Sequence, residues 1–278
     1  MKVIDFQITA QCNLECRFCC DSLKSCKSSS YDQIERMIKK ISKTSVETIS
    51  LTGGEPLLFT NIVSVINCLK KNNINIYLST NGILLQKFYD DILPKIETIG
   101  LPIDSINTNT LKLIGRNQNQ YELNLKHIKY IQEKYPKIKI KIGTVVSQYN
   151  INELEELGEK LSKILRKNDV WRLYQFSPIG IGKLNESDFF IDEDKFNSEI
   201  KRIKIKYDNI NVSSLSVEEA NDAYIFITPD LRLAEFTNNK FNFINYLENL
   251  SQEEIEGVLR NDRKILKNIE QNREWLKP

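Results

Sequence analysis

CNLECRFC, residues 12–19, is the stretch around which the rest of the chain is organised. It places three cysteines, Cys12, Cys16 and Cys19, within eight residues, and Phe18 stands directly before the third of them. Three thiolates this close favour an iron–sulfur cluster, because a [4Fe–4S] cube held by three cysteines keeps one iron without a protein ligand. An open iron distinguishes a cluster that takes part in chemistry from one that only carries electrons. The motif therefore predicts a reactive cluster, and later motifs should indicate what binds the open iron.

Zinc is the alternative occupant of these thiols. A structural zinc site normally has four protein ligands, and the single histidine, His127, is far away in the chain, so Cys20 or Cys26 would have to complete the set. The six cysteines lie at positions 12, 16, 19, 20, 26 and 68. This clustering indicates metal binding in a reducing compartment and argues against a secreted disulfide framework. We expect Cys20, Cys26 and Cys68 to be free thiols, and His127 to lie on the solvated polar face of its helix.

The bulk composition narrows the class of protein. The chain has 278 residues, enough for one large α/β domain or two modest ones. Its 39 basic and 37 acidic residues give a net charge of +2, which argues against a nucleic-acid polymer or an anionic membrane as partner. No run of about eighteen apolar residues predicts a transmembrane helix, and the first eight residues lack the pattern of a signal peptide. We expect a cytoplasmic protein.

Strand patterns alternate with helix patterns along the first two thirds of the chain. The predicted strands cover residues 2–8, 48–53, 74–80, 97–103, 137–146 and 170–176, and the predicted helices cover residues 31–42, 61–71, 83–93, 107–114, 121–135 and 152–165. Six such units predict a parallel sheet. Six are too few for a closed eight-stranded barrel, so we expect an open, partial (β/α)6 barrel. The predicted domains are a core, residues 1–176, and a C-terminal α/β extension, residues 177–278, that covers the barrel mouth.

Four motifs follow the predicted strands directly. They are the cysteine stretch, GGEP at 53–56, TNG at 80–82 and PIDS at 102–105. Ligand sites of α/β sheets are built at the carboxyl ends of the strands, so these motifs should meet there. Gly53 and Gly54 would let the backbone approach a ligand closely, and Glu55 could accept a hydrogen bond from an ammonium group. GGEP by itself is only a turn.

The CxxxCxxC spacing with Phe18, followed one β/α unit later by GGEP, resembles the signature of the radical SAM superfamily. The resemblance implies that S-adenosylmethionine (SAM) chelates the open iron, and that the reduced cluster cleaves it to a 5′-deoxyadenosyl radical that abstracts hydrogen from a substrate. It also implies an oxygen-sensitive enzyme and a low-potential electron donor such as flavodoxin or ferredoxin. Arg116 is suited to clamp the methionine carboxylate. The residues expected to bind the cofactor are Phe18, Gly53, Gly54, Glu55, Thr80, Asn81, Asp104 and Arg116.

Later stretches are similar to the viperin-like branch of this superfamily. They are PIDS…LIGR, KIGTVV, WRLYQF, and DAYIFI followed by Arg232, and the resemblance spans about residues 5–232. Viperin-like enzymes dehydrate the ribose of nucleoside triphosphates to 3′-deoxy-3′,4′-didehydro products. The resemblance implies a lyase with a nucleotide as its small-molecule substrate. Lys141 and Arg172 would bind substrate phosphate if they point into the barrel, although strand residues can also face solvent. Tyr224 would line the substrate pocket as a catalytic residue.

The chain departs from that branch in the substrate region. Pro102 replaces a serine, Gly143 replaces an asparagine, Val170 replaces an arginine, and Glu218 and Glu219 stand where that branch is rich in lysine. A charge-assisted contact contributes about 1.5–3 kcal/mol, so these changes lower the affinity expected for a triphosphate. Two alternatives stay open. One is radical SAM modification of another small metabolite or a peptide, and the other is a noncatalytic iron–sulfur or zinc-binding scaffold.

Overall fold

The computed structural model describes residues 2–20, 23, 26–221, 224–238 and 240–261. The strands of these residues form one sheet in the order β10-β9-β8-β1-β2-β3-β4-β5-β6-β7. They are β1 (Val3–Thr9), β2 (Thr48–Gly53), β3 (Asn75–Ser79), β4 (Thr98–Pro102), β5 (Lys139–Val146), β6 (Val170–Gln175), β7 (Asn211–Leu215), β8 (Ile225–Ile227), β9 (Arg232–Thr237) and β10 (Lys240–Tyr246). The first six run parallel in chain order, and β10 does not pair with β7. The predicted open, partial (β/α)6 barrel is confirmed.

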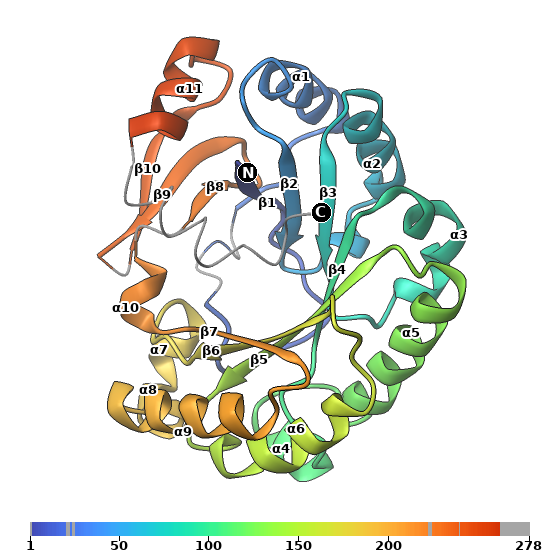
Figure 1. Ribbon diagram of the computed structural model, residues 1–278. Helices are drawn as coiled ribbons and strands as arrows, with labels where there is room; N and C mark the ends of the chain where they lie inside the picture. Colours follow the sequence, from blue (N-terminus) through green and yellow to red (C-terminus); the bar gives the residue numbers. More distant parts are fainter. Residues whose placement is uncertain (1, 21–22, 24–25, 222–223, 239, 262–278) are drawn as a thin grey trace.

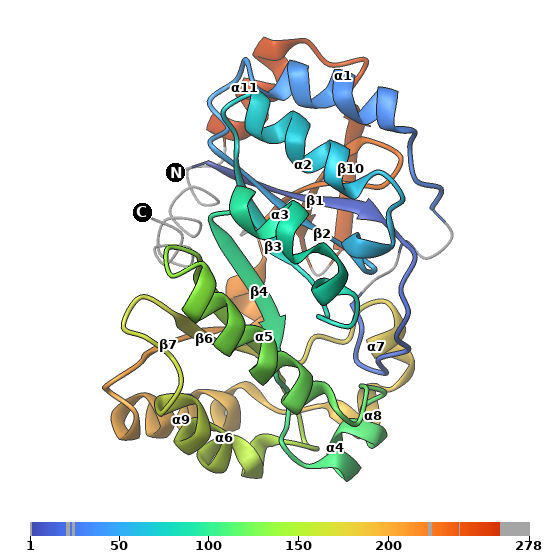
Figure 2. The same ribbon diagram turned by 90° about the vertical axis from the view of Figure 1, so that its right-hand side faces the viewer.

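Helices cover the convex side of this curved sheet (Figure 1). The α-helices are α1 (Tyr31–Ile41), α2 (Ile62–Lys71), α3 (Tyr89–Ile92), α4 (Thr108–Leu113), α5 (Gln120–Lys134), α6 (Leu154–Ser162), α7 (Ile181–Leu184), α8 (Glu186–Phe189), α9 (Glu193–Lys206), α10 (Val217–Ala220) and α11 (Gln252–Asn261). Short 3-10 turns are η1 (Pro56–Leu58), η2 (Leu85–Phe88), η3 (Leu93–Lys95) and η4 (Ile151–Glu153). Seen from the side, α1, α2, α3 and α5 follow one another along the outside of the sheet (Figure 2). No described helix combines the length and the apolar character needed to cross a membrane.

The strand pleat separates the apolar from the polar side chains of the core strands. Successive side chains of a strand point to opposite faces, so alternate residues share a face. The outward residues are apolar, buried and packed in the main core: Ile4, Phe6, Ile49, Leu51, Ile76, Leu78, Ile99, Ile140, Ile142, Trp171 and Leu173. Most of the inward residues are polar and line one cavity: Asp5, Gln7, Ser50, Thr52, Tyr77, Ser79, Gly100, Lys141, Gly143, Arg172 and Tyr174. The hydrophobic core therefore lies between sheet and helices, and the inside of the barrel is reserved for ligand.

Helix α1 illustrates how the covering helices form. Ser30 accepts the backbone N–H of Gln33, while the Gln33 side chain accepts the backbone N–H of Ser30. This capping box satisfies two donors that the first turn would otherwise leave unpaired. Four buried apolar residues at helical spacing then face the sheet: Ile34, Met37, Ile38 and Ile41. One segment differs from prediction, since residues 83–93 form η2 and α3 in place of a single helix, and Pro94 cannot donate to continue the ladder.

Strands beyond residue 177 extend both edges of the core sheet. β7 pairs parallel with β6, whereas β8 pairs parallel with β1 and begins an antiparallel run through β9 to β10. The short helix α10 connects β7 toward β8, and its Val217 and Ala220 line the cavity. The C-terminal segment thus closes part of the barrel from two sides. The predicted division at residue 176 stays a prediction, because the strands on both sides of it share one sheet.

Two helical glycines give a test of the packing between helices. An alanine Cβ at Gly158, in α6, would lie 2.4 Å from Cε2 of Tyr207, whereas one at Gly257, in α11, would meet nothing within 4 Å. Alanine favours a helix over glycine by about 1 kcal/mol, but overpacking costs about 1–3 kcal/mol. Gly158→Ala should therefore lower the free energy of unfolding measured with urea, and Gly257→Ala should raise it. Equal stabilisation by both variants would contradict the packing of α6 on Tyr207.

Candidate active site

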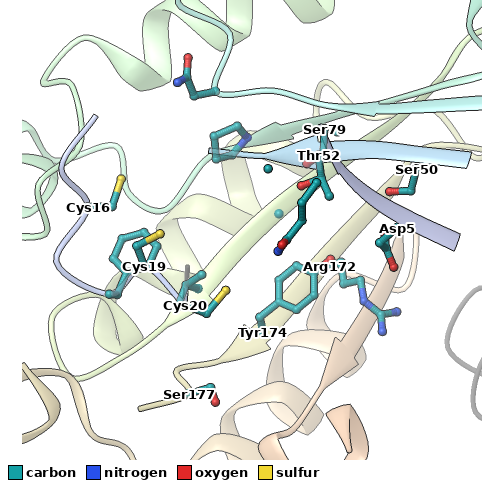
Figure 3. Close-up of a pocket in the computed structure, with 18 of the residues that line it drawn as sticks. Asp5, Cys16, Cys19, Cys20, Ser50, Thr52, Ser79, Arg172, Tyr174 and Ser177 are labelled. Carbon is teal, nitrogen blue, oxygen red and sulfur yellow. The ribbon is translucent and has the colours of Figure 1, made fainter. Parts of the chain in front are cut away.

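A cavity of about 470 Å³ occupies the inside of the barrel. Its volume lies in the range of about 300–1,000 Å³ typical of small-molecule sites. Every residue predicted from the sequence to bind metal, cofactor or substrate lines it: Cys12, Cys16, Phe18, Cys19, Gly53, Gly54, Glu55, Thr80, Asn81, Asp104, Arg116, Lys141, Arg172 and Tyr224. In Figure 3 the labelled cysteines lie at one end of the cavity and Asp5, Ser50 and Arg172 at the other. The tertiary structure thus assembles motifs spread over 213 residues into one site.

The cysteine loop, residues 10–20, is held on one side by the end of β2. The N–H of Gly54 donates to the carbonyl of Thr9 at 2.7 Å, and the N–H of Glu55 donates to the carbonyl of Gln11 at 2.7 Å. A Cβ at Gly53 would lie 2.3 Å from the Thr9 oxygen, and one at Gly54 would lie 2.2 Å from the Gln11 oxygen. Any side chain there would push the loop away. The two glycines thus permit close approach of the cysteine loop itself, in addition to lining the cavity.

The other side of the cysteine loop is held by the turn after α4. Gly115 has a φ of +77°, and a Cβ there would lie 2.3 Å from the Glu15 oxygen. The N–H of Arg17 donates to Ile114 at 3.0 Å, and its guanidinium donates to the Leu113 carbonyl at 3.1 Å and to Asn185 Oδ1 at 3.1 Å. The loop is therefore fixed between two glycine-containing turns before any metal binds.

The thiols and their surroundings fit an iron–sulfur cluster. All three cysteines line the cavity; Cys12 is exposed to solvent, Cys19 is half-buried, and Cys16 is buried. Burial raises the pKa of the Cys16 thiol to about 11, and the nearby Arg116 guanidinium opposes that rise. A bound metal deprotonates a coordinating thiol, and a cation beside the thiolates stabilises them further. Among the described residues, no three Cys, His, Asp or Glu side chains converge on one metal ion, but each thiolate of a cube binds a different iron, so a cube does not require that convergence.

Arg116 is held in place by a buried carboxylate. Its Nε donates to Asp104 Oδ2 at 2.7 Å, while Asp104 Oδ1 accepts the N–H of Val145 at 2.8 Å. The guanidinium carbon lies 4.9 Å from the centre of the Phe18 ring. Burial lowers the pKa of Arg116, but Asp104 and the Cys16 and Cys19 thiols together raise that pKa by more, so it lies above the usual value for arginine. Because only Nε is engaged by Asp104, the terminal nitrogens can bind a ligand carboxylate, as predicted for the methionine group of SAM.

The Glu55 carboxylate links GGEP to the TNG turn. It is fully buried; Oε1 accepts the Thr80 hydroxyl at 2.6 Å and the Leu57 N–H at 3.1 Å, and Oε2 accepts the Asn81 N–H at 2.7 Å. Burial raises the pKa of Glu55, and these donors oppose the rise. Asn81 in turn donates to Asn13 of the cysteine loop at 2.7 Å. Glu55 thus orders the turns around the cavity, and direct contact with an ammonium stays a prediction.

Helix α5 supports the TNG turn from outside, which the sequence reasoning missed. Gln120, Asn124 and His127 lie one and two turns apart and are at most 1% exposed. Gln120 donates to the Asn81 carbonyl at 2.5 Å, and His127 Nε2 lies 2.8 Å from the Gly82 carbonyl. The prediction that His127 is solvated is wrong. Its spacing from Gln120 and Asn124, on the side of the helix that also carries buried isoleucines, was the available signal.

Lys141 and Arg172 point into the barrel and not toward solvent. Lys141 is 8% exposed and Arg172 is 2% exposed. The Lys141 ammonium lies 5.1 Å from the ring centres of both Tyr77 and Tyr174, and the Arg172 guanidinium lies 5.5 Å from the ring of Tyr174. A cation placed over an aromatic face is attracted by the ring quadrupole. The two tyrosines therefore keep these cations extended inside the cavity.

An aromatic wall from the C-terminal strands lines the cavity near β1. It consists of Tyr224, Phe226, Phe236 and Phe241, whose neighbouring ring centres are 5.0–5.6 Å apart. Phe226 is in register with Asp5, so Tyr224, two residues earlier, lies toward the start of β1, whereas the cysteines follow its end. Tyr224 belongs to the cavity as predicted. Its catalytic role stays a prediction.

Several cavity residues could have been found from strand alternation. Inward polar residues stand at every second position between outward apolar ones in β1, β2 and β3: Asp5, Gln7, Ser50, Thr52, Tyr77 and Ser79. The period of two identifies them once the outward face is known to be apolar.

Cys20 also lines the cavity, whereas Cys26 and Cys68 do not. Cys68 lies on α2, packed in the main core.

The sequence of this chain is similar to one protein family and to several named enzymes. The family model of the Radical SAM superfamily matches residues 6–161. A protein of Fibrobacter sp. (strain UWH6) named S-adenosylmethionine-dependent nucleotide dehydratase is 25% identical over 299 residues, covering 97% of this chain and 88% of that protein. A GTP 3′,8-cyclase of Clostridium perfringens (strain SM101 / Type A) is 31% identical over 187 residues, covering 63% of this chain and 55% of the cyclase.

The fold is shared with solved structures. The crystal structure of Streptococcus suis SuiB bound to S-adenosylmethionine superposes with a TM-score of 0.68 at 18% identity, covering 93% of this chain and 67% of SuiB. SuiB has also been solved bound to its precursor peptide SuiA. At this identity the likeness concerns the fold alone.

Replacing the cysteines one at a time should show which thiols are needed for iron uptake and which are not. Cys12→Ala, Cys16→Ala and Cys19→Ala should each lose most of the iron taken up in anaerobic reconstitution, against about four irons per chain in the parent protein. Cys20→Ala should keep its iron, and Cys68→Ala, in α2, is the control. Iron and sulfide analysis measures the outcome. Loss of iron in Cys20→Ala equal to that in Cys16→Ala would make Cys20 a ligand.

The titration of His127 should report its burial directly. Burial lowers its pKa below the usual 6.5, so the unfolded chain binds a proton before the folded chain does. The free energy of unfolding should therefore fall as pH drops below about 6.5, by about 1.4 kcal/mol per unit of pKa difference at most. Because His127 is the only histidine, one imidazole NMR signal gives the folded pKa, with the urea-unfolded chain as reference. A folded pKa at or above that of the unfolded chain would contradict the buried, neutral ring.

Proposed function

Because this chain belongs to the radical SAM superfamily, with a [4Fe–4S] cluster and SAM as its cofactors, we propose that it dehydrates the ribose of a nucleotide. The observation that carries the proposal is the pair of buried cations, Lys141 and Arg172, inside the cavity that the three cysteines border. Charged donors that face a cavity form strong hydrogen bonds with an anionic ligand. The phosphate of a nucleotide is such a ligand.

The chemistry divides between the cofactors and the chain. When bound, the cluster and SAM supply the radical chemistry that removes a hydrogen atom from a substrate. The chain's own residues bind and orient. Arg116, fixed by Asp104, would hold the methionine carboxylate, while Glu55 keeps the TNG turn in place beside it. The substrate's reacting carbon must then lie toward the cysteine end of the cavity, because positioning decides which hydrogen is removed.

Lys141 and Arg172 would hold the phosphate away from the reacting end. Figure 3 shows Arg172 at the end of the cavity opposite the cysteines, with Thr52, Ser79 and Tyr174 between them. A nucleotide lying along the cavity would thus have its phosphate on the cations and its sugar toward the cysteines. Arginine suits the phosphate because its planar donors match the phosphate oxygens, and lysine adds a compact charge.

The aromatic wall of Tyr224, Phe226, Phe236 and Phe241 would receive the base. Nucleobases stack on aromatic side chains with little dependence on sequence, at about 1–3 kcal/mol per base. The wall comes from β8, β9 and β10, which join the sheet beside β1. The names of the dehydratase and the GTP cyclase relatives support a nucleotide as well. A peptide, as in SuiB, or another small metabolite is the alternative that a substrate panel distinguishes.

The cofactor chemistry implies an electron donor and sensitivity to oxygen. A cluster of this kind needs a low-potential electron, for which flavodoxin or ferredoxin is the proposed donor. The open iron makes the enzyme oxygen-sensitive, so activity should require anaerobic handling. A cytoplasmic location is part of the proposal, because clustered cysteines suit metal binding in a reducing compartment.

A nucleotide panel tests the proposal. With reconstituted enzyme, SAM and dithionite, some nucleotide should accelerate the release of 5′-deoxyadenosine, and Lys141→Met and Arg172→Met should raise its half-saturating concentration about 10- to 100-fold, since a charged contact contributes about 1.5–3 kcal/mol. Lys163→Met, at an exposed residue that pairs with Glu159, is the charge-matched control.

One outcome would contradict a nucleotide substrate. If no nucleotide accelerates 5′-deoxyadenosine release while iron and SAM uptake are normal, the substrate is not a nucleotide. Peptides and other small metabolites would then be tried in the same assay.

A further inference from the structure

The hydroxyl of Tyr77 lies inside the cavity, against the backbone of β4. Tyr77 is 5% exposed, lines the cavity and is in register with Thr98. A Cβ at Gly100, farther along β4, would lie 2.3 Å from the Tyr77 hydroxyl oxygen. The side chain therefore leans toward the carboxyl ends of the strands, where the cysteine loop follows β1. Glycine at position 100 leaves the space that the hydroxyl occupies.

Two polar side chains share this level of the cavity. Gly100 is in register with Ser79 on one side and with Lys141 on the other. The Lys141 ammonium lies 5.1 Å from the centre of the Tyr77 ring. Figure 3 shows Ser79 between the cysteine end of the cavity and the end with Arg172. The Tyr77 hydroxyl thus stands in the middle of the cavity, where the sugar of the nucleotide would lie.

The surroundings of Tyr77 suit an acid. Burial raises the pKa of its hydroxyl, while the charge of Lys141 and hydrogen bonds with Lys141 and Ser79 oppose that rise. Since the usual pKa of tyrosine is about 10, the group is protonated at neutral pH. A nearby cation favours the anion that remains once the proton has left. Tyr77 can therefore donate a proton, and Lys141 stabilises the phenolate.

We propose that Tyr77 is the catalytic acid that protonates the hydroxyl group leaving the ribose. The proposal rests on the proposed function, because a dehydration has a leaving hydroxyl. Hydroxide leaves poorly, and a positioned acid contributes about 10²–10⁴-fold to such a step. The two carboxyls toward the cysteine end have other partners, since Glu55 accepts three donors of the neighbouring turns and Asp104 accepts Arg116.

Atoms and electrons balance in this step. After a hydrogen atom has been removed from the neighbouring ribose carbon, the C–O bond breaks and its electron pair stays with the oxygen. The Tyr77 proton joins that oxygen, so water leaves. The sugar radical cation takes one electron from the low-potential one-electron donor and becomes the didehydro sugar. Lys141 stabilises the Tyr77 phenolate until solvent returns the proton.

Tyr77→Phe should separate proton donation from hydrogen removal, because it keeps the ring beside Lys141 and removes only the hydroxyl. The assay uses cluster-loaded protein, SAM, dithionite and the four common ribonucleotides, each deuterated in the ribose. The variant should still transfer deuterium into 5′-deoxyadenosine but form the dehydrated nucleotide about 100-fold more slowly than the parent protein. Nucleotide affinity, measured by calorimetry, should stay within about threefold of the parent. Tyr130→Phe, the same change in α5 outside the cavity, should keep the parent rate.

Gly100→Ala tests the same hydroxyl from β4. The added Cβ would displace the Tyr77 hydroxyl, so this variant should also keep deuterium transfer and lose dehydration. In the Tyr77→Phe background the hydroxyl is already absent, so the alanine should slow dehydration much less. Additive losses in the double variant would contradict an action of Gly100→Ala through the hydroxyl.

The outcomes distinguish the inference from the proposed function. Dehydration by folded Tyr77→Phe at the parent rate overturns the role of Tyr77 and leaves the proposed function standing. Loss of deuterium transfer along with dehydration also overturns it, because the hydroxyl would then only position the substrate. If the parent protein neither transfers deuterium from any ribonucleotide nor dehydrates one, both fall. If Tyr77→Phe does not fold, Gly100→Ala decides by the same two readouts.

Discussion

The alternation of side chains along six parallel strands is the constraint on which the rest of this structure depends. Each core strand presents apolar residues, such as Ile49 and Leu51 in β2, to the covering helices, and polar residues, such as Ser50 and Thr52, to the inside. Burial of the outward set stabilises the sheet through the hydrophobic effect, so the inward set does not have to pack as a core. A closed barrel of this kind fills its interior with side chains. The open sheet leaves room there for ligands.

The cysteine loop depends on a second kind of contact, between backbones. Gly53 and Gly54 on one side and Gly115 on the other let neighbouring turns approach the loop so closely that no side chain would fit. Hydrogen bonds through Glu55 and Asn81 then join the loop to the TNG turn, and α5 holds that turn from outside. Glu55, Asn81 and Gln120 in this arrangement are buried. The thiols are thus presented at the cavity edge by elements that do not themselves react, which is how precise sites are built.

The cavity has two ends with different electrostatics. The end with the cysteines contains the Arg116–Asp104 pair, whose geometry suits an amino-acid carboxylate. The far end contains Arg172 and Asp5 (Figure 3), and the Tyr174 ring contacts both Arg172 and Lys141. Under the proposed function, the first set of residues would bind the cofactor, which all radical SAM enzymes share, and the second set would bind the substrate, which they do not. Asp104 and Arg116 lie in the loops before and after α4, whereas Lys141 and Arg172 lie on β5 and β6, so the substrate end can change its charge without disturbing the cluster.

Much of this could be predicted from the sequence. The cysteine spacing, the GGEP turn and the β/α periodicity are local, so the order of the sheet, the thiol set and the residues around the cavity followed from segments a few residues long. The roles of particular side chains could not be predicted from such short segments. Glu55 meets Thr80 across 25 residues, and His127 meets Gly82 across 45. The C-terminal strands join both edges of a sheet that the first 176 residues already predict. The sequence by itself determined that three thiols stand within eight residues of one another, because their spacing is covalent. Only the tertiary structure decided which carboxylate braces a turn, which histidine is buried and which charges face the cavity, because burial and partners arise only when distant segments meet.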